Sequence, residues 1–496
     1  MTPIWTTNEW SWPLIERVYG ACEEIAVNDL NLNIYPNQIE IISSEQMLDA
    51  YASIGMPIYY KHWSFGKHFL QNQKSYEAGT SGLAFEIVIN SSPCINYLME
   101  DNTMTTQALV IAHAAFGHNH FFKNNYLFKQ WTDASGIIDY LVFARDYVAA
   151  QEAKHGLKAV ETWLDSCHAV MDHGVNRYKR PSKISLEKEK QKQRERSEYL
   201  QSQVSELYRI LPEQKKLSGT RKEDTAFPQQ PEENLLYFFE KYSPDIEDWQ
   251  RELLRIVRKI AQYFYPQGQT KVMNEGFASL IHYEIMNRLH DKGLTTNGAH
   301  LEFLALHSNV LYQPSYNSKN YSGINPYAFG FAMLRDIQRM CSNPTKEDLR
   351  WFPEIKGKNA WDLILESVSE YRDESFIRQW LSPKVIRDLR LFSVHDDRED
   401  EKKYLVSSIH NEKGYADIRE KLADQHLRTS MVPHIEVGKV DRKTRTVYLY
   451  YTPHNGRMLG NVEKMLVHIE RLWGGYPVVI MSNNGTTLIK SSDKQR

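Results

Sequence analysis

The chain has 496 residues, of which 42% are hydrophobic and 25% charged, and its formal net charge is −2 at pH 7. This length allows two or three domains with well-buried cores, and the near-neutral charge argues against a nucleic-acid-binding surface. The four cysteines are scattered without a Cys-x-x-Cys pair, which argues against both a disulfide framework and a thiolate zinc site.

Residues 1–180 are predicted to be mainly helical, with one short strand. The first residues lack the basic stretch and apolar core of a targeting sequence, and no run approaches the roughly 20 apolar residues that a membrane span needs. We therefore expect a cytoplasmic protein with no membrane partner. Residues 83–90, Leu-Ala-Phe-Glu-Ile-Val-Ile-Asn, are rich in β-branched side chains and are soon followed by Pro93, so they predict the strand.

A histidine pair follows, at the end of a buried helix predicted over residues 103–116. His113 and His118 lie in the segment Val-Ile-Ala-His-Ala-Ala-Phe-Gly-His, five residues apart. Five steps of about 100° place two helical side chains about 140° apart, so a regular α-helix cannot direct both imidazoles to one ion. A π-bulge, or a helix end at Gly117, would bring them together. In the alternative, one histidine is a hydrogen-bonded core residue and the other faces water.

A carboxylate candidate lies far downstream, in residues 272–279, Val-Met-Asn-Glu-Gly-Phe-Ala-Ser. Glu275 has apolar neighbours and needs a partner, because an unpaired buried carboxylate is costly. That partner is either a metal ion or a nearby arginine. His282 lies seven residues further on, on the same helical face and about 10.5 Å along the axis. It is therefore a candidate ligand of the same or a second metal site, or a residue that supports a ligand.

The two segments resemble the zinc-binding motifs of gluzincin-type zinc peptidases, in which His-Glu-x-x-His supplies two ligands and Asn-Glu-Gly-Phe-Ala supplies the third. The resemblance implies a site for zinc or another divalent transition metal, with the candidate ligands His113, His118, Glu275 and His282. Ala114 stands where those enzymes carry their general base, so a catalytic site would need another residue in that role. The candidates are His120, His168, Glu86 and His307.

Residues 181–234 are predicted to form a charged helix followed by a polar linker. Acidic residues interleave with the basic ones at 183–196, which argues against a nucleic-acid partner. From 235 to 392 the helical pattern resumes, and the stretch 249–261 is strongly amphipathic. We expect this second helical region, which carries Glu275, to pack with the first.

The remaining residues, 393–496, differ in kind. Short β-branched runs alternate with two amphipathic helices in the order β-α-β-β-α-β, which is typical of a ferredoxin-like domain. Such a domain would serve ligand sensing, self-association or structural capping. The chain as a whole is predicted to be α+β and mainly α, with a large helical body that includes a zincin-like region and with a C-terminal ferredoxin-like domain.

Several long stretches are distinctive as a set: Ser-Glu-Gln-Met-Leu-Asp-Ala-Tyr at 44–51, His-Trp-Ser-Phe-Gly-Lys at 62–67, Phe-Phe-Lys-Asn-Asn-Tyr at 121–126 and Gly-Ile-Asn-Pro-Tyr-Ala at 323–328. Through them, nearly the whole chain resembles the SpoVR (stage V sporulation protein R) family. The resemblance implies a role in sporulation, in spore-cortex formation or in stress response, and a serine-kinase-type protein partner. It carries over no catalytic residues.

Two functions follow from these observations. The first is a metal-dependent hydrolase of peptide or peptidoglycan-type amides, built on the histidine and glutamate site. The second is a non-enzymatic regulator or scaffold, in which a degenerate zincin-like body has lost its general base and the C-terminal domain mediates association. Ala114 favours the second function, and the retained Asn-Glu-Gly-Phe-Ala segment favours the first.

Overall fold

The computed structural model describes residues 2–52, 59–63, 86–176, 227–228, 231–314, 321, 323–391, 394–396, 404–406, 412–427, 432, 434–452, 462–482 and 487–490. The charged helix predicted at 183–196 lies outside them. The described part of the chain is mainly helical with small mixed sheets, which confirms the predicted α+β, mainly α class. No helix among the described residues is both long and apolar enough to span a membrane.

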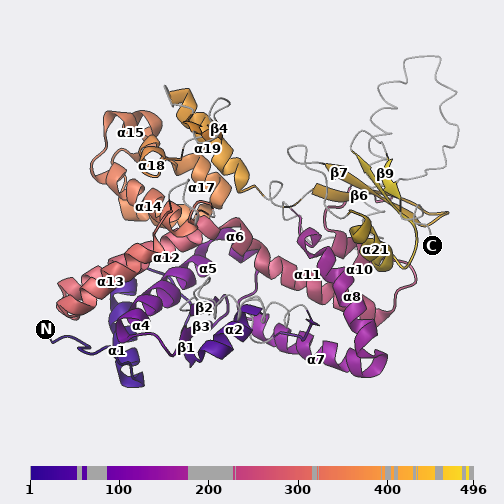
Figure 1. The fold of residues 1–496 in the computed structure, drawn as a ribbon, viewed down its shortest axis with the longest axis horizontal. Coiled ribbons are helices and arrows are strands. Elements are labelled where there is room, and N and C mark those ends of the chain that lie inside the picture. The colour runs from indigo at the N-terminus through magenta and orange to yellow at the C-terminus, as the bar shows by residue number, and fades with distance from the viewer. Residues whose placement is uncertain are drawn as a thin grey trace, which may run out of the picture.

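The helices gather around two hydrophobic cores. The first core lies in the part of the molecule that holds the N-terminus, where α12 (Lys271–Asp291) packs between its neighbours (Figure 1). Around it lie α1 (Trp12–Glu24), η1 (Ile25–Asp29), α4 (Met104–Ile111), η2 (Ala112–His118), α5 (Asn119–Asn124), α6 (Tyr126–Trp131), α13 (Asn297–Val310), α14 (Pro326–Ser342), α15 (Lys346–Trp351), η4 (Pro353–Ile355), α16 (Ala360–Glu370), α17 (Asp373–Trp380), α18 (Pro383–Asp388) and α19 (Glu412–Gln425).

The second core lies toward the C-terminal end of the molecule and is rich in aromatic side chains. Its helical elements are α2 (Ser44–Ala52), α7 (Ile137–His155), α8 (Leu157–Ala169), η3 (Met171–His173), α10 (Leu235–Tyr242), α11 (Asp248–Gln269) and α21 (Val462–Leu472). The amphipathic stretch predicted at 249–261 lies within α11. A capping box between Glu247 and Gln250 fixes the start of that helix.

A three-stranded sheet lies between the two cores, in the order β1 (Asn37–Ile42), β3 (Cys94–Met99) and β2 (Glu86–Ile89). Strand β1 runs parallel to β3 and β2 runs antiparallel to it. The prediction of a single strand in this region was therefore wrong, because it found β2 alone. Side chains alternate along a strand, so Ile87 and Ile89 enter the second core while Val88 packs against the first. Glu86 shares the face of Val88.

Helix α12 approaches its neighbours closely. A Cβ atom on Gly276 would lie 2.4 Å from the carbonyl carbon of Gly330 in α14, so these two helices touch at their backbones. The start of α12 is anchored by Asp373 of α17, whose carboxylate accepts hydrogen bonds of 2.9 Å from the backbone N–H groups of Val272 and Met273. The middle of α12 is thereby held in a fixed position within the first core.

The described C-terminal residues are arranged differently from the predicted ferredoxin-like domain. Strands β6 (His434–Asp441), β7 (Thr446–Thr452), β8 (Val478–Ser482) and β9 (Thr487–Lys490) form one sheet in sequence order, with β7 and β8 parallel. A ferredoxin-like sheet would need the first predicted strand between β7 and β8. Because these two strands hydrogen-bond directly to each other, that place does not exist.

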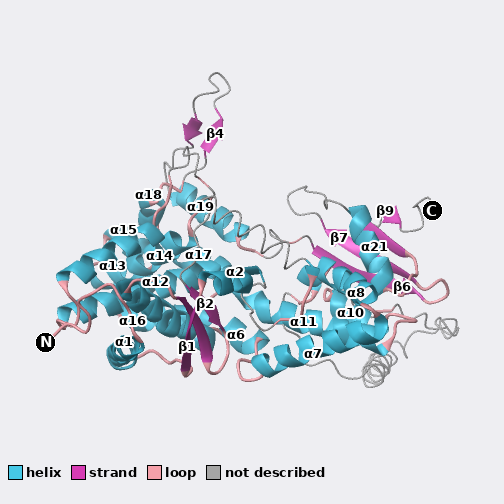
Figure 2. Ribbon diagram, turned by 60° about the horizontal axis from the view of Figure 1, so that its bottom comes forward, coloured by secondary structure: helices cyan, strands magenta, loops and turns pink. Residues whose placement is uncertain are grey.

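The first strand and first helix of the predicted domain lie elsewhere. Strand β5 (Tyr404–Val406) pairs antiparallel with β4 (Val394–Asp396) in a separate two-stranded sheet, which stands apart from the four-stranded sheet (Figure 2). Helix α19 packs against α17, where Arg378 reaches Glu420 at 2.8 Å. The prediction of a ferredoxin-like arrangement was therefore wrong. The division of the chain into four domains stays a prediction.

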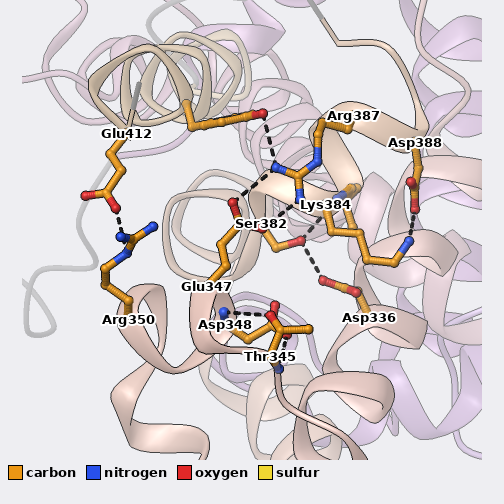
Figure 3. A network of polar contacts seen from close by, with 12 residues as sticks. Asp336, Thr345, Glu347, Asp348, Arg350, Ser382, Lys384, Arg387, Asp388 and Glu412 are labelled. Atoms are coloured by element: carbon orange, nitrogen blue, oxygen red, sulfur yellow. Dashed lines mark hydrogen bonds and ion pairs between the residues drawn. The ribbon is translucent and has the colours of Figure 1, made fainter. Parts of the chain in front are cut away.

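A polar network joins α14, α15 and α18 (Figure 3). In it, the Ser382 hydroxyl donates to Asp336 at 2.5 Å, and the Thr345 hydroxyl donates to Asp348 at 2.7 Å. Arg339 adds two parallel hydrogen bonds of 2.8 Å to the two carboxylate oxygens of Asp348. Such bidentate, charge-assisted pairs are among the stronger polar contacts in proteins.

Candidate metal centre

Both histidines of the predicted pair lie on a π-helix. Helix α4 continues directly into η2, which contains His113 and His118. The wider turn brings the two side chains to one side, with ring centroids 4.6 Å apart and planes at 89°. The predicted break in α-helical hydrogen bonding is confirmed, and it takes the form of a π-bulge because the helix continues beyond Gly117.

Helix α12 brings a carboxylate to the pair. Gly117 of η2 lies so close to Ala278 of α12 that a Cβ atom would be 2.6 Å from the Ala278 Cα. Glu275 precedes Ala278 by three residues, and its Oε2 lies 3.5 Å from Nε2 of His118 and 3.7 Å from Nε2 of His113. The three side chains converge as the two motifs predict. Metal binding by them stays a prediction.

A second carboxylate comes from the sheet. Oε1 of Glu86 lies 3.4 Å from Nε2 of His113. Glu86, His113 and His118 each offer one ligand atom, and these atoms lie within 4.8 Å of one another. The site therefore contains two imidazoles from the π-helix, one carboxylate from α12 and one from β2.

These donor atoms are spaced like ligands of one ion. Direct N–H···O hydrogen bonds measure about 2.7–3.2 Å, whereas the three nitrogen to oxygen distances are 3.4, 3.7 and 3.5 Å. Two ligands on a tetrahedral ion with bonds of about 2.0–2.2 Å lie about 3.3–3.6 Å apart. Within the described part of the chain, the buried Oε2 atoms of Glu86 and Glu275 have no hydrogen-bond partner. A divalent ion between the imidazoles would satisfy Oε2 of Glu275, which is the oxygen that faces both His113 and His118, so these residues fit one.

The other ring nitrogens of the two histidines have partners that orient them. Nδ1 of His118 donates to Oδ1 of Asn274 at 3.0 Å. Nδ1 of His113 lies 2.9 Å from Nδ1 of His282, whose Nε2 lies 2.7 Å from Nδ1 of His307. Histidines that bind a metal usually make such a bond with their second nitrogen. His282 contacts His113 through Nδ1, which fits the supporting role that its position along the helix left open.

Burial and charge act in opposite directions on the protonation of the four groups. Burial raises the pKa of Glu86 to about 7 and lowers the pKa of His118 to about 4. Burial also disfavours the charged forms of His113 and Glu275. Nearby opposite charges outweigh it, so that Glu86 raises the pKa of His113 and His118 lowers the pKa of Glu275. His118 is thus neutral at pH 7, as an imidazole ligand must be.

Two of the other candidate bases lie in different surroundings. Nδ1 of His120 accepts a hydrogen bond of 3.0 Å from the backbone N–H of Asn33. His168 of α8 contacts the hydroxyl of Tyr60 and the ring of His62. Among the four candidate bases, only Glu86 belongs to the group of potential ligand atoms.

Two residues beside the site were not predicted from the sequence. Asn274, the partner of His118, directly precedes Glu275. Its position in the Asn-Glu-Gly-Phe-Ala segment could have indicated that it belongs to the site. Tyr327 of α14 stacks with His113 at a centroid distance of 6.1 Å. Its position in the distinctive stretch 323–328 could have indicated a role near the site.

Comparison with known proteins assigns the chain to a family. Residues 9–431 match the family described as "SpoVR like protein", and residues 433–485 match the "SpoVR-like C-terminal domain". The chain belongs to the SpoVR family. It is 54% identical over 479 residues to the uncharacterized protein YcgB of Escherichia coli (strain K12), an alignment that covers 96% of this chain and 93% of YcgB. No solved structure gives a significant match. All four donors of this SpoVR-family chain lie in the first matched segment.

Proposed function

We propose that this SpoVR-family protein binds one divalent transition-metal ion through His113, His118 and Glu275 and hydrolyses amide bonds of peptide or peptidoglycan-type substrates. The observation that carries the proposal is the spacing of the donor atoms, 3.4 to 3.7 Å between imidazole nitrogens and carboxylate oxygens. That spacing is longer than a direct N–H···O hydrogen bond and suits the coordination shell of one ion.

Glu86 is the proposed general base. A bound divalent ion would supply Lewis-acid chemistry, by lowering the pKa of a water molecule and polarising a carbonyl group. Glu86 lies against the same imidazole as Glu275, and its Oε2 has no hydrogen-bond partner among the described residues. This carboxylate can take the proton of the attacking water and give it to the leaving amine. It thereby supplies, from strand β2, the group that Ala114 lacks.

Two substitutions separate the roles of the carboxylates. In Glu275→Gln, the metal content of the purified protein, measured by elemental analysis, should fall well below one ion per chain. In Glu86→Gln, the metal should remain while hydrolysis of a panel of peptides and cell-wall muropeptides, followed by mass spectrometry, falls by about 10²- to 10⁴-fold. Glu284→Gln is the matched control, because Glu284 lies on α12 and pairs with Arg288 at 3.4 Å. Wild-type protein without bound metal would refute the proposal, as would full activity in Glu86→Gln.

A second candidate function follows from the same distances. Glu86 lies as close to His113 as a fourth ligand would, and a site with four protein ligands is closed and structural. In that case the metal stabilises a non-enzymatic scaffold. Loss of metal from both Glu86→Gln and Glu275→Gln, with no turnover by the wild type, would favour this function over the hydrolase.

The family resemblance extends the proposal to the cell. We place the protein in the cytoplasm, in a sporulation or stress programme, with a serine-kinase-type protein as its partner. Co-purification of the tagged chain from its own host tests the partner. The absence of any kinase-type protein from the washed complex would remove this part of the proposal.

A further inference from the structure

Behind the candidate metal centre, three imidazoles form a continuous hydrogen-bonded row. His113 of η2 contacts His282 of α12 through the two Nδ1 atoms, and Nε2 of His282 contacts Nδ1 of His307 in α13. His282 is fully buried and His307 is 7% exposed. The ring of His307 lies 5.0 Å from those of Tyr283 and Phe331, between centroids, so its position is fixed by packing.

Both hydrogen bonds of the row are donated in the same direction, away from His113. Each neutral imidazole carries one N–H, and each contact needs one donor and one acceptor. If Nε2 of His113 presents a lone pair to a metal, its N–H must be on Nδ1, and Nδ1 of His282 must accept. The N–H of His282 is then on Nε2, and Nδ1 of His307 must accept in turn. A single tautomer of each ring therefore satisfies both contacts.

We propose that His282 and His307 are positioning residues that hold His113 in the tautomer with its Nε2 lone pair directed at the proposed metal position beside Glu86 and Glu275. This role rests on the metal site proposed above. His282 acts on His113 directly, and His307 acts through His282 by fixing which nitrogen of that ring carries hydrogen. Asn274 orients His118 through one hydrogen bond. The row orients His113 in the same way, but through two successive hydrogen bonds, the second of which reaches α13.

The simpler explanation is that the two histidines only fill space in the core. The two explanations differ in what a substitution changes. Space-filling residues affect the free energy of unfolding, whereas positioning residues also affect the affinity of the metal and the symmetry of its coordination. A substitution that keeps the acceptor at the Nδ1 position should preserve the second effect.

The test is a titration of the full-length metal-free chain with Co²⁺, followed by its d–d absorption, together with thermal unfolding. His282→Leu removes the imidazole acceptor and leaves the His113 ring only its backbone partner at Ala278, and affinity should fall about 10- to 100-fold with an altered spectrum. His282→Asn offers Oδ1 near the place of Nδ1 and should recover most of the affinity. His307→Leu should weaken binding less than His282→Leu. His300→Leu is the control on α13, because His300 stacks with His290 at 4.1 Å, outside the row.

The Co²⁺ titrations separate the positioning role from the metal site itself. If the wild type binds Co²⁺ while His282→Leu and His307→Leu keep its affinity and spectrum, the positioning role is refuted and the metal site stands. Equal weakness of His282→Asn and His282→Leu would also refute it. If the wild type itself does not bind Co²⁺, the metal site and the positioning role are both wrong. Should His282→Leu not fold, His282→Asn and His307→Leu still carry the test.

Discussion

Glu86 and His113 face each other at 3.4 Å between Oε1 and Nε2, although they come from a strand and a π-helix that belong to different layers of the fold. The sequence around each residue does not determine this contact between them. The alternation of side chains along β2 turns Glu86 toward the first core, and the π-bulge turns His113 toward the strand. Together with His118 and Glu275 they form a compact donor set deep in the helical body.

The first prediction concerns the contact between the π-helix and α12. Gly117→Ala would place a Cβ 2.6 Å from the Cα of Ala278, and backbone atoms cannot yield as a flexible side chain would. We expect a loss of about 1–3 kcal/mol in the free energy of unfolding, as for other overpacked cores, and weaker metal binding because η2 moves away from Glu275. Chemical unfolding and a metal titration measure the two effects.

Gly20→Ala is the control for this substitution. Gly20 also lies in a helix, and an added Cβ there would meet no atom within 4 Å. Alanine should stabilise that position by about 0.5–1 kcal/mol. If Gly117→Ala behaved like Gly20→Ala in both measurements, the close packing of η2 on α12 would not be what positions the site.

The second prediction concerns Asn274. Asn274→Ala removes the acceptor for Nδ1 of His118, so the ring can rotate and change tautomer. Metal affinity should fall about 10- to 100-fold, with little change in the thermal midpoint of the metal-free protein. Asn287→Ala serves for comparison, because Asn287 lies on the same helix and donates to the Tyr283 carbonyl instead. Equal affinities in the two variants would show that His118 needs no orienting partner.

The third prediction concerns stability and pH at the Arg339–Asp348 pair. Burial alone would raise the pKa of Asp348, but the hydrogen bonds from Arg339 and Thr345 lower it to about 2. A carboxyl with a depressed pKa stabilises the fold above its unfolded pKa, and this contribution is lost as pH falls through the folded value. Asp348→Asn should therefore cost about 2 kcal/mol at pH 7, and about half of that near pH 3.

Unfolding of the wild type and Asp348→Asn, followed in parallel from pH 7 to pH 3, checks this. Asp388→Asn is a suitable comparison, since Asp388 makes its ion pair with Lys384 at the surface, where such pairs contribute little. A difference between wild type and Asp348→Asn that stayed constant or grew toward pH 3 would contradict the assigned charge state.

The histidine and glutamate part of the site could be predicted because each half carries a local signal. The five-residue spacing of His113 and His118 demands an irregular helix, and the apolar surroundings of Glu275 demand a partner. The contacts that orient and position these side chains involve residues that are distant in the sequence. Asn274 could be read only as part of a motif, and the contact of Gly117 with Ala278 depends on how two distant helices approach each other.

Strand pairing was predicted least well, for a physical reason. The runs at 94–99 and 37–42 are short, and short apolar runs do not distinguish a strand from a buried helix. Their parallel pairing joins residues far apart in the chain, so no local pattern specifies it. At the C-terminus the element types were predicted correctly for β5, α19, β6, β7, α21 and β8. The placement of β5 and α19 was wrong, because partner choice depends on long-range contacts.

We infer that one divalent ion is bound between the π-helix, α12 and β2. Crystals grown with saturating Zn²⁺, measured at wavelengths above and below the zinc absorption edge, test it most directly. We predict one strong anomalous peak in this site, at about 2.0–2.2 Å from Nε2 of His113 and Nε2 of His118 and within bonding distance of Glu275. A map with no peak among these side chains, or with zinc bound only at surface residues, would show that they do not form a metal site.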